Sequence, residues 1–204
     1  MENLEVIMTA ERRRMSRARI LAGAFDILDA GVYSDLTVDA LARALHMSKS
    51  TLYKYFSSKD DVVIALIDEA CATTDAELAA LEMAGSRATL EAMVEVLAHH
   101  ADRVPQAAVL HPHRLPIPCQ DRLDRTRRSV HRSAREAMRR ALAAGHVHVN
   151  HRNLAADGLV AASLAAMVTA AEEGFEGGRG DAVRAMFRMM QPGLMAARAS
   201  RATG

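Results

Sequence analysis

Apolar residues recur at helical intervals through most of the chain, and one short repeat directly follows Thr37. Its members fall at i, i+3, i+4 and i+7: Val38, Leu41, Ala42 and Leu45. This spacing places them on one face of a helix. Threonine is a residue type that caps helix N-termini, because its hydroxyl accepts from an unpaired N–H of the first turn. The pattern therefore predicts a short amphipathic helix that begins at Thr37.

A second short helix is predicted directly after a turn at His46 and Met47. Ser48 is placed to cap it, and Leu52 and Phe56 repeat at i and i+4 on its apolar side. Its remaining positions carry hydroxyl, basic and aromatic side chains: Lys49, Ser50, Thr51, Tyr53, Lys54 and Tyr55. A helix with such a surface suits the major groove of DNA, where small donors reach base edges and phosphates.

Helical patterns continue on both sides of this motif. Upstream, an apolar stripe predicts a first helix that ends at Gly31 with a positive φ: Ile20, Leu21, Ala24, Phe25 and Leu28. Downstream, further helices are predicted over residues 60–70, 89–104, 122–144, 154–173 and 181–191. Four prolines predict a loop before residue 122, and Pro192 is expected to kink or stop the last helix. Without alternating β-branched runs, the predicted fold is all-α.

Composition limits the compartment more than the function. The 204 residues have a net charge of +1, but residues 1–59 hold nine Lys or Arg against seven Asp or Glu. Two cysteines, Cys71 and Cys119, do not make a disulfide framework in a chain of this length. The first residues lack the apolar stretch of a signal peptide, and the longest uncharged apolar run, 158–171, is too short to span a bilayer. We expect a cytoplasmic protein without a membrane partner.

The order of helix, turn, S-K-S-T-L-Y-K-Y-F and S-S-K-D-D resembles the N-terminal domain of the TetR (tetracycline repressor-like) transcriptional regulators. The resemblance covers about residues 16–67, with Tyr33 at the family's loop aromatic and Thr37 at the threonine that opens its second helix. It implies an N-terminal three-helix DNA-binding domain with a helix-turn-helix at residues 1–60. It also implies a C-terminal helical domain for ligand binding and dimerisation at residues 61–204.

The family's DNA contacts carry over to nine positions: Thr37, Ser48, Lys49, Ser50, Thr51, Tyr53, Lys54, Tyr55 and Lys59. Lys49 is the candidate for a guanine edge, and Lys59 and Thr37 are expected to bind the phosphate backbone. Tyr53 and Tyr55 resemble phosphate-contacting aromatics of the family. The alternative for each tyrosine is that it packs into the core of the domain.

In the family, the two C-terminal helices form a four-helix bundle with those of a second chain. The matching apolar positions are Leu159, Leu164, Met167, Val168, Val183, Met186, Phe187 and Met190. The alternative is that these side chains close the core of a monomer. An effector pocket is assigned to Met93, Leu97, Met138 and Phe175, and its ligand is predicted to be apolar or aliphatic. The alternative is an ordinary Ala- and Met-rich core.

The resemblance thus implies a ligand-responsive regulator, most simply a repressor, that binds a palindromic operator as a homodimer and is released by a small molecule. An activator or a ligand-independent regulator of the same fold is the alternative. No cofactor is expected. No G-x-S-x-G, glycine-rich phosphate loop or H-E-x-x-H occurs, so an enzyme is not predicted.

For three segments rich in charged or metal-ligating residues, the sequence leaves two interpretations open. The arginines between Arg12 and Arg19 form either a solvated helix end or part of a DNA-binding face. Eight arginines between residues 121 and 140 form either a solvated face or a strip for an anionic effector such as an acyl-coenzyme A. His111 and His113 with Cys119 supply three donors suited to Zn, but no regular metal spacing appears, and no metal site is predicted.

Overall fold

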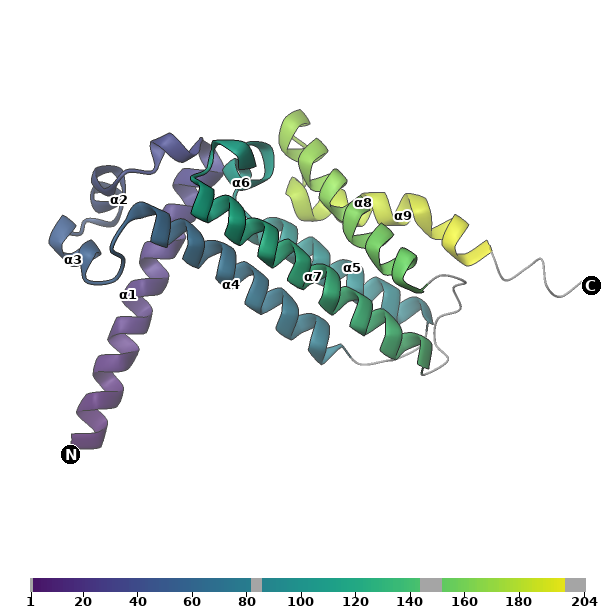
Figure 1. The fold of residues 1–204 in the computed structure, drawn as a ribbon, viewed down its shortest axis with the longest axis horizontal. Coiled ribbons are helices and arrows are strands. Elements are labelled where there is room, and N and C mark those ends of the chain that lie inside the picture. The colour runs from purple at the N-terminus through teal and green to yellow at the C-terminus, as the bar shows by residue number, and fades with distance from the viewer. Residues whose placement is uncertain (1, 82–85, 144–151, 197–204) are drawn as a thin grey trace, which may run out of the picture. The chain divides into compact units, whose positions relative to one another are not determined.

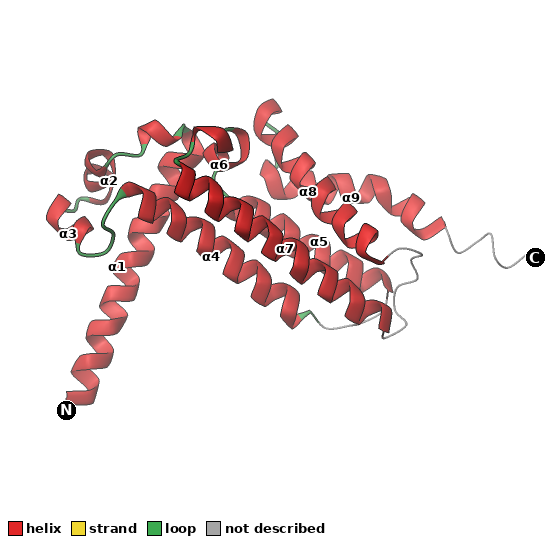
Figure 2. Cartoon of the chain, in the orientation of Figure 1, coloured by secondary structure: helices red, strands yellow, loops and turns green. Residues whose placement is uncertain are grey.

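The computed structural model describes residues 2–81, 86–143 and 152–196, and every regular element in these ranges is a helix (Figure 2). The all-α fold class predicted from the sequence is therefore confirmed. Figure 1 labels the α-helices: α1 Glu2–Ala30, α2 Val38–Leu45, α3 Lys49–Tyr53, α4 Lys59–Ala80, α5 Ser86–Arg103, α6 Gln106–Leu110, α7 Ile117–Ala143, α8 Arg152–Glu173 and α9 Gly178–Ala196. Two 3-10 turns accompany them: η1 Tyr33–Asp35 and η2 Pro112–Arg114.

The chain divides into two compact units that do not follow the sequence order. The first unit contains Met1–Glu69 and Pro105–Arg125, and the second contains Ala70–Val104 and Thr126–Gly204. The long helices α4 and α7 each contribute residues to both units. The functional domain boundary at residue 60 stays a prediction, because contacts alone do not define function.

The core of the first unit is built on the apolar stripe of α1, where Ile20, Ala24 and Leu28 are almost wholly buried. α1 packs on α2 closely enough that a Cβ on Gly23 would lie 2.8 Å from the side chain of Leu45. At its other end, the carboxylate of Asp29 accepts a 2.9 Å hydrogen bond from the backbone N–H of α6. These contacts fix α2 and α6 on α1.

In the second unit, α5, α8 and α9 pack against one another around buried Met93, Leu97, Val183 and Phe187. α9 starts directly on α5, where the Gly180 N–H donates a 2.8 Å hydrogen bond to Asp102. A Cβ at Gly180 would lie 2.9 Å from a backbone oxygen of α5, so only glycine permits this approach. This packing forms the apolar core of the second unit.

Polar side chains join the part of α4 in the second unit to α5 and α7. Asp75 accepts hydrogen bonds from Ser129 at 2.8 Å and Ser133 at 2.7 Å, both on α7. On the α5 side, the Thr74 hydroxyl lies 2.8 Å from Nδ1 of His100. Wholly or partly buried polar groups that are paired in this way fix the register of neighbouring helices, because an unpaired one costs free energy.

Three local predictions differ from the structure. Gly31 follows the end of α1 but does not have a positive φ; instead the Asp35 carboxylate sits where its Cβ would be and binds the Val32 N–H. The predicted proline loop contains α6 and η2, and α7 already begins at Ile117. Proline lacks only an N–H, which the first turn of a helix does not use, so Pro105 and Pro112 occur at helix starts.

The last helix also differs. It begins at Gly178 and continues through Pro192 to Ala196, so this proline does not end it. A proline inside a helix removes one backbone hydrogen bond, and the bonds on either side can hold the helix. Gly174 does end α8 with a φ of 68°, which lets the Phe175 N–H return to the carbonyl of Ala170.

None of the helices in the described part of the chain is long and apolar enough to cross a bilayer.

His100 makes the stability of the fold depend on pH. Burial lowers its pKa to about 4, and the nearby Arg103 acts in the same direction. The unfolded chain binds a proton at this histidine below pH ~6.5, whereas the folded chain binds it only near pH 4. We therefore expect unfolding free energy to fall as pH drops from about 6.5 to 4, by roughly 1–3 kcal/mol from this group. Urea unfolding at several pH values measures this loss.

The matched variant is His100→Gln, which keeps a side-chain partner for Thr74 but does not titrate. Its unfolding free energy should vary less with pH over this window than that of the parent. Equal slopes for the two proteins would contradict the assignment to His100.

Candidate nucleic-acid interface

The helix-turn-helix is fixed by backbone caps that the sequence predicted. The Thr37 hydroxyl accepts a 3.0 Å hydrogen bond from the Ala40 N–H at the start of α2. α2 ends at His46, whose φ of 52° and ψ of 43° place it in the left-handed region. The Met47 N–H then bonds to the Ala42 carbonyl at 2.9 Å, which closes the helix end and redirects the chain. The turn therefore sets where α3 begins.

The N-terminus of α3 carries a cluster of hydroxyl groups. The Ser48 hydroxyl accepts a 3.1 Å hydrogen bond from the Thr51 N–H and so caps the helix. It also lies 2.9 Å from the Ser50 hydroxyl and 2.8 Å from that of Thr51. Because the hydroxyls bond to one another, they are ordered before any ligand arrives, and each can rotate to donate outward.

α3 has a buried side and an exposed side. Leu52 and Phe56 are 5% and 9% exposed, whereas Tyr53 is 55% exposed. The other exposed side chains are those of Thr37, Ser48, Lys49, Ser50 and Lys54, and those of Thr51, Tyr55 and Lys59 are half-buried. The regular helix ends at Tyr53, so Lys54 and Tyr55 lie just past its end rather than on it.

Lys49 is paired in the free protein with an acid that the sequence did not bring to notice. Its ammonium forms an ion pair with Asp39 in the first turn of α2, and both side chains are mostly exposed. The hydrogen bond to this carboxylate raises the pKa of Lys49. Lys49 therefore stays charged, and Asp39 competes with any other anion for its ammonium. Asp39 and Lys49 are ten positions apart, so only the fold reveals the pair.

Lys59 lies in a second cluster at the start of α4. Its ammonium is 4.0 Å from the ring centroid of Tyr33, a cation–π contact. The Tyr33 hydroxyl donates a hydrogen bond to the Asp60 carboxylate. Burial raises the pKa of Tyr33 most, and this hydrogen bond raises it further. Ser58 caps α4 by accepting a 3.1 Å hydrogen bond from the Asp61 N–H. The cluster orients Lys59 along the rim of the helix-turn-helix.

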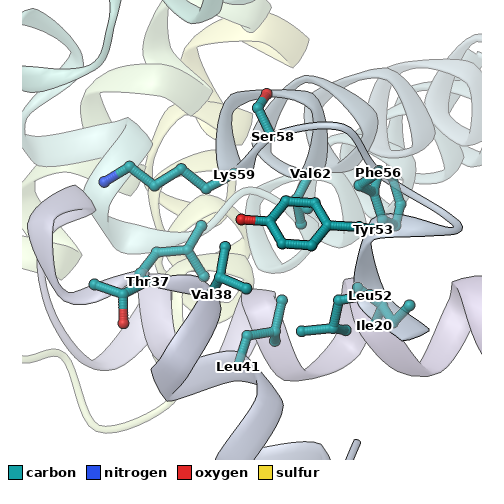
Figure 3. Close-up of a pocket in the computed structure, with 11 residues that line it drawn as sticks. Ile20, Thr37, Val38, Leu41, Leu52, Tyr53, Phe56, Ser58, Lys59 and Val62 are labelled. Atoms are coloured by element: carbon teal, nitrogen blue, oxygen red, sulfur yellow. The ribbon is translucent and has the colours of Figure 1, made fainter. Parts of the chain in front are cut away.

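A small crevice of about 20 Å³ brings several of these groups together (Figure 3). Its walls are apolar and come from α1, α2, α3 and α4, with Ile20, Leu41 and Val62 among them. Tyr53 lies across it, and its hydroxyl points to the same side as Lys59 and Thr37. The volume suits one water molecule and not an organic ligand. The crevice is therefore the centre of a surface with polar groups at its rim.

In the second unit, the residues assigned to dimerisation differ in exposure. Four of them are buried within the chain itself: Leu159, Met167, Val183 and Phe187. Leu164, Val168 and Met186 are half-buried, and Met190 is 40% exposed. Only these last four present surface that a second molecule can cover without repacking the core.

The residues assigned to an effector pocket are not all in one place. Met93, Leu97 and Met138 are at most 2% exposed and belong to the core of the second unit. Phe175 is 47% exposed and lines an open depression with Glu173, Glu176 and Arg188. Three of the four residues assigned to the pocket are therefore buried in the core of the second unit, and Phe175 lies at the surface.

The histidines and cysteines have local partners. His111 and His113 face each other edge to ring with centroids 6.1 Å apart, while the Cys119 thiol is buried against the Asp60 carbonyl. Burial raises the pKa of Cys119 to about 11, so the thiolate that binds metals is disfavoured. Among the described residues no three His, Cys, Asp or Glu side chains converge as a metal site would require. His146, His148 and His151 lie outside the described residues.

Comparisons with known proteins agree with the geometry of the first unit. Residues 20–66 match the family model described as bacterial regulatory proteins, tetR family. This segment spans the core stripe of α1, the helix-turn-helix and the start of α4. No curated protein matches the chain in sequence.

Solved structures share the fold over most of the chain. The fatty acid degradation regulator FadR from Bacillus halodurans has a TM-score of 0.72 at 16% identity, over 88% of this chain and 96% of that one. A TetR-family transcriptional regulator from Agrobacterium tumefaciens has a TM-score of 0.71 at 18% identity, over 89% and 98%. FadR from Bacillus subtilis in complex with stearoyl-CoA has a TM-score of 0.61 at 10% identity, over 85% and 96%.

Proposed function

We propose that this chain, which belongs to the tetR family of bacterial regulatory proteins, is a repressor in which α3 reads operator DNA. The observation that carries the proposal is the exposed polar side of α3. That side presents Lys49, Ser50 and Tyr53 to solvent while Leu52 holds the helix on the core. A short, capped helix with small donors at its N-terminus fits the major groove, and phosphate contacts fix its register.

The phosphate contacts are assigned to the rim of the crevice. Thr37, Tyr53 and Lys59 lie at its edge, close to the N-termini of α2 and α4. Unpaired N–H groups at such ends favour anions, and a lysine adds charge. Lys49 is assigned to a base edge, since it is at the first position of α3. In this assignment Lys49 reads the base sequence, whereas the three residues at the rim of the crevice position the protein on the phosphate backbone. Such a regulator acts in the bacterial cytoplasm, where the DNA lies.

A dimer is proposed because one α3 reads only a short stretch of DNA. The support comes from the outer side of α8, where Gly158, Ala161 and Ala165 are exposed at a spacing of three and four. Small side chains on one helix side let a second helix approach closely. On α9, Met189 and Met190 are 76% and 40% exposed and add apolar area. A two-fold dimer through these helices places two α3 helices on a palindromic operator.

The effector is proposed to be an aliphatic molecule that enters the second unit among Met93, Leu97 and Met138. These side chains are long, apolar and flexible, so they can move to admit an alkyl chain. FadR from Bacillus subtilis, which shares the fold, is a regulator in complex with stearoyl-CoA. Because the three side chains are at most 2% exposed, the free form is closed, and ligand has to stabilise an open one. The protein is released from DNA if, in that open form, α3 is positioned so that it no longer fits the operator.

The first test concerns how the lysines divide the work. Lys49→Ala should weaken binding to the preferred site by ~1–3 kcal/mol and relax base choice, whereas Lys59→Ala should weaken all sites alike. Asp39→Asn should strengthen binding severalfold, because Lys49 is freed and a negative charge leaves the surface. Fluorescence anisotropy on a selected operator and a scrambled duplex measures all three.

The control for Asp39→Asn is Asp26→Asn, the same charge change on the exposed side of α1. Parent-like binding by Lys49→Ala and Lys59→Ala would remove the proposed roles of α3 and α4. If Asp26→Asn strengthens binding as much as Asp39→Asn, the ion pair with Lys49 has no special part.

The second test concerns the dimer. Ala165→Arg puts a long charged side chain on the exposed small side of α8, so it should convert the dimer to a monomer and weaken operator binding at least tenfold. Sedimentation velocity measures the mass, and anisotropy measures the binding. Ala76→Arg on the exposed side of α4 is the matched control and should leave the mass unchanged. A parent that sediments as a monomer at micromolar concentration rejects the dimer.

The third test concerns the effector. A long-chain acyl-CoA or the free fatty acid should raise the melting temperature and lower operator affinity, whereas coenzyme A alone should do neither. Met93→Gln, which makes the core polar, should reduce the ligand-induced shift. Met189→Gln makes the same change at a 76% exposed site and should leave the shift intact. If no alkyl ligand changes the melting temperature, the aliphatic effector is wrong.

A further inference from the structure

The N-terminal part of α1 extends beyond the rest of the first unit. α1 is 29 residues long and starts at Glu2, whereas the family match starts at residue 20. Figure 1 shows this part running alone, away from α2 and α3. All side chains from residue 10 to residue 15 are exposed. Packing against the core therefore does not explain this segment.

The exposed segment is rich in positive charge. It contains Arg12, Arg13 and Arg14, of which Arg14 forms a 3.3 Å ion pair with Glu11. No ion pair or hydrogen bond joins Arg12 or Arg13 to another side chain in the described part of the chain from residue 10 onward. Two adjacent exposed guanidinium groups attract an anion of extended shape.

The position of these arginines follows from two others on the same helix. Arg19 donates a 3.1 Å hydrogen bond to the carbonyl of Leu45, just before the turn that leads into α3. Arg17 lies over the ring of Phe56, just after α3, with 5.4 Å from its Cζ to the centroid. The part of α1 from Arg17 to Arg19 therefore contacts both ends of residues 45–56, the segment that contains α3 and is called the recognition segment below.

Helical spacing places Arg12 and Arg13 on the same sides of α1 as Arg19 and Arg17, farther toward its N-terminus. Arg13 precedes Arg17 by one turn and shares its side, and Arg12 precedes Arg19 by two turns and shares its side. At 1.5 Å per residue, Arg12 lies about 10 Å farther along the axis than Arg19. That distance corresponds to roughly three base pairs of DNA. The free arginines thus lie beside the recognition segment but beyond its reach.

We propose that Arg12 and Arg13 bind phosphates of the DNA that flanks the base pairs read by α3. The proposal rests on the proposed function, since it needs α3 to sit in a major groove. DNA is the partner because the two arginines continue a surface already attached to α3, and because guanidinium groups bind phosphate strongly. The extension lengthens the contact with DNA without adding base-specific contacts.

The test compares two duplexes and one double variant of the full-length protein. One duplex contains only the selected operator, and the other has about ten additional base pairs on each side. The parent should bind the longer duplex more tightly, and Arg12→Gln with Arg13→Gln should remove most of that gain, about three- to tenfold. The slope of log K against log [salt] should become shallower by about two per protein chain on the longer duplex only.

Three controls define the result. Glutamine keeps helix propensity close to that of arginine, and circular dichroism checks that the helix content is unchanged. Arg128→Gln with Arg132→Gln makes the same charge change at exposed positions of α7 and should keep the gain. Arg12→Lys with Arg13→Lys keeps both charges and should retain most of the slope.

Two results overturn the inference while leaving the proposed function in place. One is an equal slope for parent and glutamine variant on the longer duplex. The other is an equal loss for the control variant on α7, which would mean that net charge alone is responsible. If the parent binds neither duplex, the proposed function fails and this inference fails with it. Binding of the parent to anionic lipid vesicles, lost in the glutamine variant without change on DNA, would assign the arginines to a membrane instead.

Discussion

The burial of Leu52 and Phe56 is the constraint on which the exposed polar side of α3 depends. A helix of five residues has no stability of its own, because nucleation costs more than so few backbone bonds return. α3 exists because these two side chains enter the core formed with α1 and because Ser48 caps its start. The exposed side, with Lys49 and Tyr53, is fixed in direction as a consequence. Any change that loosens the apolar core of the first unit therefore also changes the direction in which these donors point.

The charges around this surface are balanced in the free protein. Lys49 is held by Asp39, and Lys59 lies over Tyr33, whose hydroxyl binds Asp60. Exposed ion pairs such as that of Lys49 with Asp39 contribute little to stability, so they can be exchanged for contacts with another anion at little cost. They do lower the attraction to polyanions in general, because part of the positive field is cancelled.

Sequence patterns predicted the local features of this fold and missed those that depend on distant residues. Caps at Thr37 and Ser48 were predicted because each joins residues three apart. The ion pair between Asp39 and Lys49 crosses a turn and is visible only in the fold. In α8, alanines occur on all sides, so periodicity did not distinguish buried Met167 from half-buried Val168. Gly31 was assigned a positive φ, but its lack of a Cβ serves the approach of a carboxylate instead.

The division of the chain into units has a consequence for how a ligand can act. Residues 105–125 follow α5 in sequence, yet they belong to the first unit, where Gln106 binds Asp29 and Arg122 binds Asp68. The chain therefore passes from second unit to first at Val104–Pro105 and returns within α7, in addition to its passage through α4. This segment is covalently continuous with α5 and α7, whereas a hydrogen bond and an ion pair hold it on α1 and α4. A ligand changes DNA affinity only if its own affinity differs between two arrangements of those attachments. If an effector acts through this connection, the contacts of Asp29 and Asp68 are where its effect reaches α1 and α4, because they hold the returning segment on these two helices.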